Sequence, residues 1–548
     1  MACSKIFSGD LPELTSEIIE YFRYDFSTLY SCILVNRLFC RVAIPSLWED
    51  PFSITTENYN FIKIYLSNLN DDDKTKLNEY GIDKNCIPSN TLFNYPNYIK
   101  SLNIQINYYI ELWVKNFNNN YSIKYTFPSN STILIYKSLF KIFIENGATL
   151  HTFDVISYVH HEYLNETFEL ILKNPNFIRN IKNLKLQGIT NLPKFNSLLS
   201  LLNSNCNLIS TLHFQFNDDL LISSSIINSQ KNLKKILYKY NDFPSNYSLL
   251  SLKDSNCSNT LKTIIFHETD FKDINILKEV FEQLNCLESI HILYCRSLNS
   301  HFIQQIVNIT KPFKLRSLFL NEPIESLQLL IQKSNNYLEN IGFRTFIIND
   351  QNNRQLVEKI LSNCRKINFF DFSYIHTSDH IYQTFDLIKN VGQNLNYLSI
   401  EFDFTHTNTI KLSSIILKKL GQILPLKLEY LKLSLVIYTT DFKTFLDNSQ
   451  NIFIKKLVIK NIILQSNLFE KIKKFVIKNT NQDILPYIEE YIIKKKRVKY
   501  LAFKEDYMGL RDLFLLKDQV KKFELYDIKV QKYDDLNIYL YKYIEETY

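Results

Sequence analysis

The sequence predicts an α/β protein in which a small all-helical segment precedes a long array of strand–helix units. Three observations indicate this fold class. A short apolar phrase recurs along most of the 548 residues, helical patterns alternate with it, and the opening segment follows neither pattern. A chain of this length exceeds what one ordinary core supports, whereas the core of a repeat array grows with the chain. We expect the helical segment at 9–52, a connecting segment at 53–95 and the array at 96–548.

Composition narrows the class of protein. Hydrophobic residues make up 45% and charged residues 22%, as in folded globular proteins. The net charge of +7 is small for this length, and the lysines are scattered among acidic residues, so nucleic acid is not expected as a partner. Only 8 glycines occur, and neither a dinucleotide-binding motif nor a P-loop is present.

The sequence also contains few signals that would direct the protein to a membrane or a compartment. No apolar run reaches the roughly 18 residues that a spanning helix requires, and the start "MACSKIFSGD" lacks a secretory pattern. The 9 cysteines contain no C-x-x-C and fit reduced thiols better than disulfides. We expect a cytoplasmic protein without membrane partner, metal or cofactor. The run "KKKRVK" at 494–499 resembles a nuclear-import signal, which leaves the nucleus as an alternative, although cations are also favoured at a helix end.

The opening segment predicts helices with more apolar side chains than they can enclose. Capping-box spacing at its start predicts a helix from about Pro12 to Tyr24. A second helix is expected over 27–43, and Pro45 is expected to end that pattern. A segment of some forty residues buries too little surface to cover so many large apolar side chains. Another surface is therefore expected to cover them.

The recurring phrase has the form L-x-x-L-x-L, with Ile, Phe, Val or Tyr allowed. Successive central residues lie 23 to 33 positions apart, which is the signature of a repeat. Four weaker copies begin at Ile99, Leu150, Val498 and Val520. The central residues of the eleven clear copies are Leu184, Leu212, Ile236, Ile264, Ile290, Leu318, Ile341, Phe370, Leu398, Leu431 and Leu457.

Between the phrases lie amphipathic helical patterns. The stretch "DINILKEVFEQL" places its apolar residues at i, i+3, i+4 and i+7, on one side of a helix. Each unit is therefore a short strand followed by a helix, and only stacking of the units buries their apolar sides. The final "DDLNIYLYKYIEETY" predicts a helix with Leu536, Leu540 and Ile544 inward, which we expect to close the exposed end of the array.

These phrases resemble the leucine-rich repeat family. Its longer pattern, L-x-x-L-x-L-x-x-N/C, is completed by Asn217, Asn241 and Cys295, where a polar side chain can satisfy backbone groups that leave the sheet. Most repeats depart from the pattern at that position. The resemblance therefore implies a solenoid of the horseshoe type with irregular repeats.

The opening segment resembles the F-box motif. Leu11-Pro12 matches its opening pair, "EIIEYF" its first helix, "CILVNRLFCRVA" its central segment with Phe39 where the family often has Trp, and "PSLW" its closing Leu-Trp. The resemblance implies docking on a Skp-family adaptor and, through it, on a cullin scaffold. The alternative is an ordinary helical cap on the array. The residues expected to make or support the adaptor contact are Leu11, Pro12, Leu14, Ile18, Ile19, Leu29, Val35, Phe39 and Trp48.

Strand alternation predicts which repeat side chains face the open, concave side. Leu237, Ile265, Leu293 and Phe319 are expected to form an exposed apolar cluster with a polar border, which is typical of a protein-binding centre. The alternative is that helices or flanking segments cover these side chains. The expected substrate-binding residues are Leu237, Lys239, Ile265, His267, His291, Leu293, Phe319, Asn321 and Arg344.

Together these features predict a non-catalytic substrate-recognition subunit of a Skp–cullin–F-box ubiquitin ligase. Such a subunit holds a protein substrate near an enzyme elsewhere in the complex. No catalytic residues are expected: His376 and His380 are four apart but lack the Glu of a zinc-protease helix, and no nucleophile elbow is present. The rivals are a repeat scaffold without a ubiquitin role and an enzyme in an unrecognised domain.

Overall fold

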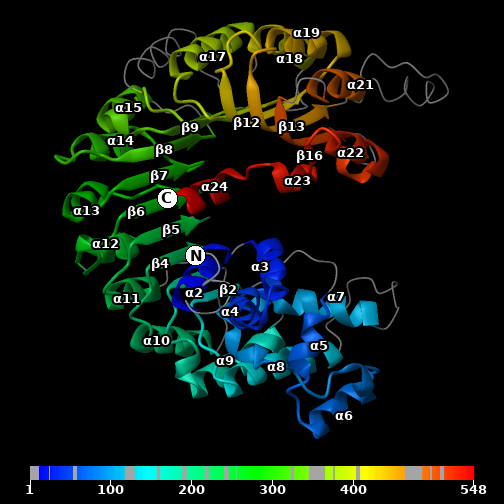
Figure 1. Cartoon of the computed structure of the whole chain (residues 1–548). Helices are drawn as coiled ribbons and strands as arrows, with labels where there is room; N and C mark the ends of the chain where they lie inside the picture. The colour runs from blue at the N-terminus through cyan, green and yellow to red at the C-terminus, as the bar shows by residue number, and fades with distance from the viewer. Residues whose placement is uncertain are drawn as a thin grey trace. The chain divides into compact units, whose positions relative to one another are not determined.

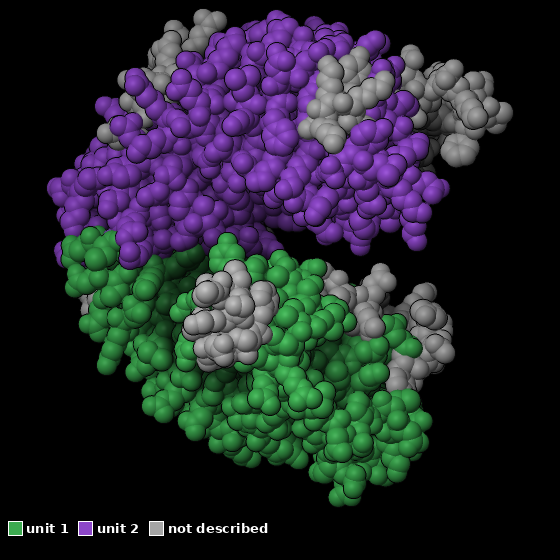
Figure 2. Space-filling model, viewed as in Figure 1, with its two compact units in different colours: residues 1–261, 284–286 green, residues 262–283, 287–548 purple. Residues whose placement is uncertain are grey.

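The computed structural model separates into two compact units (Figure 2). Unit 1 comprises residues 1–261 and 284–286, and unit 2 comprises 262–283 and 287–548. The structure describes residues 12–23, 25–53, 59–117, 130–156, 161–187, 194–215, 221–239, 246–254, 256–321, 326–344, 364–373, 377–402, 408–462, 484–493, 497–506 and 511–548.

Unit 1 is an α/β structure whose described strands run parallel, each paired with the next in the sequence. Its strands are β1 (Ser101–Asn103), β2 (Thr152–Ile156), β3 (Asn183–Gln187), β4 (Thr211–Gln215) and β5 (Lys235–Lys239). Its helices are α2 (Pro12–Tyr21), α3 (Phe26–Ile33), α4 (Arg37–Leu47), α5 (Phe61–Leu66), α6 (Asp71–Glu79), α7 (Asn107–Phe117), α8 (Asn130–Glu145), α9 (His161–Lys173), α10 (Phe195–Asn205), α11 (Leu221–Ser229) and α12 (Asn246–Asp254).

Unit 2 repeats the same alternation, and its strands β6 to β14 are parallel wherever the pairing is described. The strands are β6 (Thr263–His267), β7 (Ser289–Leu293), β8 (Leu315–Leu320), β9 (Asn340–Phe343), β10 (Phe369–Ser373), β11 (Tyr397–Glu401), β12 (Lys427–Leu435), β13 (Phe453–Ile462), β14 (Val498–Asp506), β15 (Arg511–Asp512) and β16 (Lys529–Val530). Strand β14 also pairs with β15, antiparallel, and with β16.

The helices of unit 2 fall into two groups (Figure 1). Those between the repeat strands lie on one side of the strands, and α23 and α24 lie on the other side. We call this second side the inner face. The helices are α13 (Leu277–Gln283), α14 (Ser300–Val307), α15 (Leu327–Ser334), α17 (Ser378–Val391), α18 (Thr409–Leu420), α19 (Thr439–Asn448), α21 (Leu485–Tyr487), α22 (Lys517–Glu524), α23 (Tyr533–Leu536) and α24 (Leu540–Thr547).

The repeat prediction is confirmed for all eleven clear phrases, each of which contributes a strand. The weaker copies at Ile99, Leu150 and Val498 also lead into strands, namely β1, β2 and β14. The copy at Val520 is wrong, because it lies in helix α22. Val520 and Phe523 are three residues apart, a spacing that also suits one side of a helix, and there Phe523 is buried.

The core of each unit follows the predicted central residues. In unit 1, Leu184, Leu212 and Ile236 are opposite one another in neighbouring strands, and all are fully buried. In unit 2 the register shifts once, between β7 and β8: Ile290 is opposite Leu315, and the next residue of β7, His291, is opposite Ser317. Strand β8 therefore has one extra residue at this point, a β-bulge at Arg316 that the phrase spacing did not reveal.

Buried glutamines connect successive repeats. The side chain of Gln230 donates to the carbonyl of Cys206 at 2.8 Å and accepts from the amide of Ile209 at 3.0 Å. Gln305 makes the corresponding pair of bonds in unit 2. Each glutamine satisfies backbone groups of the preceding repeat that have no partner in a strand.

Of the residues expected to complete the repeat pattern, Cys295 is buried and its thiol donates to a main-chain carbonyl of β6, 3.4 Å away. Asn217 and Asn241 lie outside the described residues. The connecting segment expected at 53–95 contains α5 and α6. It packs within unit 1, where the ring of Tyr65 lies 5.0 Å from that of Phe143.

The second N-terminal helix differs from its prediction. Instead of one helix over 27–43 there are two, because Asn36 caps α4 by accepting from the amide of Phe39 at 2.9 Å. The expected end at Pro45 is also wrong, since α4 continues to Leu47. Proline removes a single amide donor near the end of the helix, and the amide of Trp48 closes the last turn on the carbonyl of Ile44 at 3.1 Å.

Candidate functional site

The three N-terminal helices, α2 to α4, enclose a small core and leave other apolar side chains uncovered. Ile19, Leu29, Phe39 and Ala43 are buried against one another. The exposed large apolar side chains of these helices and the turn between α3 and α4 are Leu14, Tyr21, Tyr30, Leu34 and Val35. A surplus of exposed apolar side chains on so small a segment is typical of a surface that another protein covers.

The predicted adaptor-contact residues therefore separate into two groups. Ile19, Leu29 and Phe39 form the interior of the helices and support the surface. Leu14 is 41% exposed and Val35 is 50% exposed, and Ile18 is intermediate. Leu34, which is 73% exposed, is not among the predicted residues. Leu11 lies outside the described residues, and of Pro12 only its place at the start of α2 is described.

Trp48 joins the N-terminal helices to the repeats. Its ring lies 5.4 Å from the ring of Tyr65 and 4.2 Å from that of Tyr95, both of which follow it in the chain. The next residue, Glu49, accepts from the amides of Lys100 at 2.9 Å and Ser101 at 3.1 Å through its main-chain carbonyl.

The carbonyl of Glu49 continues a pattern of the repeats themselves. The carbonyl of Lys100 accepts the same pair of amides from the next strand, those of His151 and Thr152. The carboxylate of Glu49 also pairs with Arg23 at the end of α2. Burial raises the pKa of this carboxyl, and the Arg23 guanidinium opposes that rise. The carbonyl of Glu49, at the end of the helical segment, thus accepts from β1 the hydrogen bonds that a residue of a preceding repeat would accept.

The expected exposed apolar cluster is wrong. Leu237, Ile265, Leu293 and Phe319 are each completely buried. For Phe319 the reason is Gly342 in the neighbouring strand: a Cβ there would lie 2.5 Å from Cδ1 of Phe319. With no side chain in that place, the ring lies along the sheet instead of projecting from it. For His267 and His291 the stated alternative holds: another segment covers this side of unit 2, because Tyr541 contacts His267 and Tyr548 contacts His291.

Residues 533–548 cover the inner face of unit 2. The expectation that this segment closes the end of the array is wrong for α24, which reaches back to β6, the first strand of the unit, where Thr263 donates to the carbonyl of Tyr548 at 3.5 Å. The predicted inward residues Leu536 and Ile544 are indeed buried, and Leu540 is intermediate. The helix prediction is confirmed except at 537–539, between α23 and α24, and at Tyr548, which follows α24.

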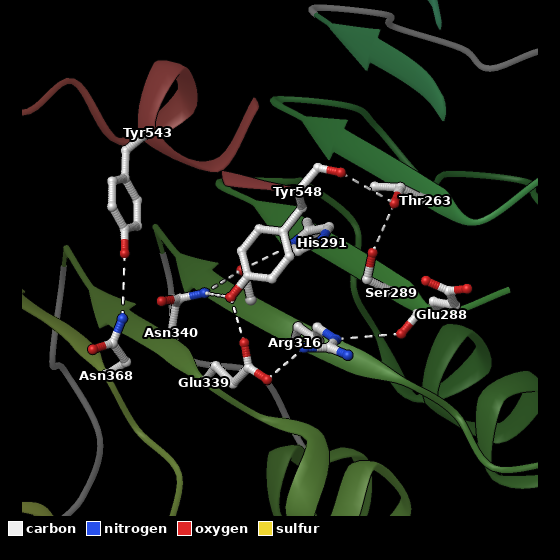
Figure 3. A network of polar contacts seen from close by, with 11 residues as sticks. Thr263, Glu288, Ser289, His291, Arg316, Glu339, Asn340, Asn368, Tyr543 and Tyr548 are labelled. Atoms are coloured by element: carbon white, nitrogen blue, oxygen red, sulfur yellow. Dashed lines mark hydrogen bonds and ion pairs between the residues drawn. The ribbon is translucent and has the colours of Figure 1, made fainter. Parts of the chain in front are cut away.

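Tyr548 lies in a network of polar side chains on β6 to β9 (Figure 3). Its hydroxyl donates to the carboxylate of Glu339 and accepts from the amide of Asn340 at 2.9 Å. Its ring lies 4.4 Å from the His291 ring, and the Arg316 guanidinium lies 5.8 Å from its centre. The bulge in β8 thus places a cation beside the aromatic ring.

The strand side chains of this network also hold one another. Arg316 donates to Glu339 at 2.6 Å. Asn340 donates to Ser317 at 2.9 Å, and Ser317 shares a 2.7 Å hydrogen bond with His291. Glu339 therefore has a cation and Asn340 an acceptor that do not depend on Tyr548.

Tyr543 and Tyr541 make the next contacts of α24. The hydroxyl of Tyr543 accepts from Asn368 at 3.3 Å, and its ring lies 5.1 Å from the rings of both Phe369 and Tyr397. Tyr541 stacks on His267, with the ring centres 4.6 Å apart.

Helix α23 is packed more deeply. Tyr533 and Leu536 are buried with Tyr430, Val458 and Ala502 of β12, β13 and β14. Segment 533–548 thus has an apolar anchor in α23 and a polar, aromatic contact through α24.

Burial shifts the pKa values of the tyrosines on this face. Desolvation raises the pKa of Tyr543 to about 12, with the neighbouring Tyr397 as the next cause. Burial also raises the pKa of Tyr548, and its hydrogen bond to Glu339 raises it further. Both phenols remain neutral at physiological pH and can donate hydrogen bonds.

The sequence prediction found the histidines of this face and missed the rest. His267 contacts Tyr541 of α24, and His291 contacts Tyr548, the residue after this helix; their role in substrate binding stays a prediction. Three of the missed residues, Arg316, Glu339 and Asn368, stand two positions before predicted central residues. Five others stand one position before the predicted central residues, and they are opposite one another in neighbouring strands. In a strand, the residue before a central residue faces the same side as the residue after it, so strand alternation would also have predicted these five residues on the inner face. They are Ser317, Asn340, Phe369, Tyr397 and Tyr430.

Asn321 and Arg344, predicted as border residues, belong to a neighbouring cluster. Arg344 lies 3.6 Å above the ring of Tyr294, and its guanidinium donates to Asn321 at 3.4 Å. The Tyr294 hydroxyl donates to Asp371 at 3.2 Å, and burial raises the pKa of that carboxyl. Both border residues are intermediate in exposure, as is Lys239 in unit 1, and their role in substrate binding stays a prediction.

Two further findings concern other kinds of site. Among the described residues, no group of three or more His, Cys, Asp or Glu side chains could hold a metal ion. Within the same part of the chain, no helix has the length and apolar character needed to cross a membrane. His376 lies outside the described residues.

The basic run at 494–499 is engaged in the fold where it is described. Arg497 donates to the main-chain carbonyls of Leu446 and Ser449, at 3.4 and 3.0 Å. The following Val498 and Lys499 belong to β14.

No protein-family model matches this chain, and no curated protein matches it.

Proposed function

We propose that this chain is the substrate-recognition subunit of a Skp–cullin–F-box ubiquitin ligase. Its N-terminal helices dock on the Skp-family adaptor, and its repeats bind the protein to be ubiquitinated. The proposal rests on one observation above all: Leu14, Leu34 and Val35 remain exposed on a helical segment whose own core is already filled by other residues. These side chains need a partner surface, and the order of the residues around them resembles an F-box.

The junction at Trp48 and Glu49 supports the same proposal. A receptor holds its substrate near an enzyme that is bound on the adaptor side. The effective concentration of the substrate is raised most when the adaptor-binding helices cannot move independently of the repeats that follow them. Here the carbonyl of Glu49 bonds to the amide of Ser101 in β1, and its carboxylate bonds to Arg23, in the turn that follows α2. The connection is therefore made by hydrogen bonds and ring packing, in addition to the chain itself.

The mechanism needs no catalytic group in this chain. A substrate bound to the repeats is held near an enzyme elsewhere in the complex, so that its lysines meet the reacting centre at high effective concentration. The rival proposal, a repeat scaffold without a ubiquitin role, explains the repeats equally well but gives no purpose to the exposed side chains of α2 to α4.

The test is co-expression with a Skp-family adaptor and measurement of affinity for the purified complex. Leu14→Asp combined with Val35→Asp should weaken adaptor binding about a hundred-fold or more, because each of the two aliphatic side chains contributes roughly 1.5–3 kcal/mol when it is fully buried and every ~1.4 kcal/mol is ten-fold. Leu92→Asp is the matched control, since Leu92 is 93% exposed and lies in the connecting segment. It should bind the adaptor as the wild type does.

Both variants replace exposed residues and should remain folded. If the folded wild type does not bind the adaptor, the ligase proposal falls and the scaffold takes its place. Equal weakening by the control and the test variant would show that the surface of α2 to α4 is not the site of contact.

A further inference from the structure

The inner face of unit 2 holds a ligand-like segment in polar contacts. Tyr548 and Tyr543, five residues apart, each place a phenol hydroxyl against an amide side chain of a repeat strand, namely Asn340 and Asn368. Tyr543 lies in α24 and Tyr548 is the residue that follows this helix, so both contacts lie beyond the link at 537–539. The apolar anchor in α23 lies before that link.

We propose that this face binds a helical segment of a partner protein that carries two tyrosines at this spacing, and that residues 540–548 occupy the site as an intramolecular ligand. This rests on the proposed function, since the partner is the substrate of the receptor. The substrate must displace α24 in order to bind. Residues 540–548 therefore compete with the substrate and set a threshold for its binding.

The strand side of the site is organised without its occupant. Glu339 is paired with Arg316, and Asn340 is bonded to Ser317, so the departure of Tyr548 leaves no buried charge without a counterion. Preorganised donors and acceptors of this kind reduce the cost of binding. A site whose polar groups depended on the tail for their partners would instead resist exchange.

The chemistry selects tyrosine over phenylalanine. The hydroxyl of Tyr548 donates to a carboxylate and accepts from an amide at the same time, which is what a phenol can do and a benzene ring cannot. The ring itself lies 4.4 Å from the His291 ring and 5.8 Å from the Arg316 guanidinium, contacts that favour an aromatic side chain. A partner that lacks the hydroxyl would leave the Glu339 oxygen without this donor.

Helix α24 is a plausible segment to exchange, because much of it remains in contact with solvent. Of its described residues only Ile544 is buried, and Lys542 and Glu546 are exposed and paired with each other. Release of α24 uncovers Ile544 and the rings that Tyr543 contacts, and a partner helix in the same place covers that surface again. Helix α23 keeps the segment attached, which places α24 at an effective concentration in the millimolar range.

The experiment uses the full chain and a fluorescent peptide of residues 536–548, with binding measured by fluorescence anisotropy. Tyr543→Ala combined with Tyr548→Ala in the full chain should weaken the internal contact and increase peptide affinity about ten-fold or more, because the competing ligand is removed. Lys542→Ala combined with Glu546→Ala, on the exposed side of the same helix, should bind the peptide as weakly as the wild type.

A second peptide with Tyr548→Phe measures the role of the hydroxyl. It should bind the tail-weakened chain about ten-fold or more less tightly, since a hydrogen bond to a charged group is removed. Thermal unfolding monitored by circular dichroism shows that each variant is folded. If the folded tail-weakened chain does not bind the peptide, or binds both peptides equally, the proposal is overturned.

Two outcomes separate this inference from the proposed function. If peptide binding fails while the adaptor still binds, only the inference about the inner face is lost. If adaptor binding fails while the peptide binds as expected, the ligase proposal is lost and the face remains a binding site for a tyrosine-bearing helix. Peptide binding only by a dimeric species in light scattering would replace the proposal with exchange of α24 between copies.

Discussion

Gly342 lies beside the ring of Phe319, and its replacement by alanine tests the packing of the inner face. The added Cβ would lie 2.5 and 2.7 Å from two ring carbons of Phe319 and 2.9 Å from the main-chain oxygen of Asp371. Carbon atoms in contact prefer separations of about 3.5–4.0 Å, so the ring would have to move by about an ångström. Since Phe319 is completely buried, we expect Gly342→Ala to destabilise unit 2 by about 1–3 kcal/mol.

The size of the effect depends on whether the ring can move. The Phe319 ring is held by the rings of Tyr294, 6.0 Å away, and Phe369, 5.9 Å away. The Asp371 oxygen belongs to the main chain of β10 and cannot move without displacing that strand. The steric clash between the new Cβ at position 342 and the ring is therefore expected to decrease only when Phe319 is replaced by a smaller residue.

Urea denaturation of four proteins gives the answer: the wild type, Gly342→Ala, Phe319→Leu and the double variant. The double variant should lose less stability than the sum of the two single losses, with a coupling of about 0.5–3 kcal/mol, because leucine leaves room for the new methyl group. A Gly342→Ala protein as stable as the wild type would refute the reasoning. So would two losses that simply add, because they would mean that the two side chains do not meet.

Three further results are expected. Because burial raises the pKa of Tyr543 to about 12, against about 10 for a free phenol, its contribution to the docking of α24 is complete below about pH 10 and is lost as the pH rises toward 12; the chain has 35 tyrosines, so the measurement is the difference in tyrosinate absorbance between the wild type and Tyr543→Phe, and a difference that appeared near pH 10 would contradict this. Gln230→Leu leaves the amide of Ile209 and the carbonyl of Cys206 unpaired, and should cost about 1–3 kcal/mol in urea denaturation, whereas an unchanged midpoint would show that water replaces the side chain. Asn36→Ala removes the cap of α4 and should cost about 1 kcal/mol of stability and weaken adaptor binding; calorimetry without a shift would mean that tertiary packing alone fixes the start of α4.

The sequence by itself determined the repeats. The alternation of apolar residues in each phrase has the period of a strand, and the stretches between have the period of a helix, so each phrase and the stretch after it predict one strand and one helix. The strand predicted at Val520 is wrong because two apolar residues three apart fit the phrase and also fit one side of a helix. In the structure this segment is helix α22, which buries Phe523. The core residues of the N-terminal helices followed from the same periodicity.

Only the tertiary structure decided what lies on the inner face. The helical pattern of 533–548 predicted which residues point inward, such as Ile544, but not the surface that receives them, because amphipathicity specifies a buried side and not its partner. The bulge at Arg316 and the missing side chain at Gly342 shifted which neighbours meet. These depend on contacts between residues far apart in the chain, and local periodicity carries no information about such contacts.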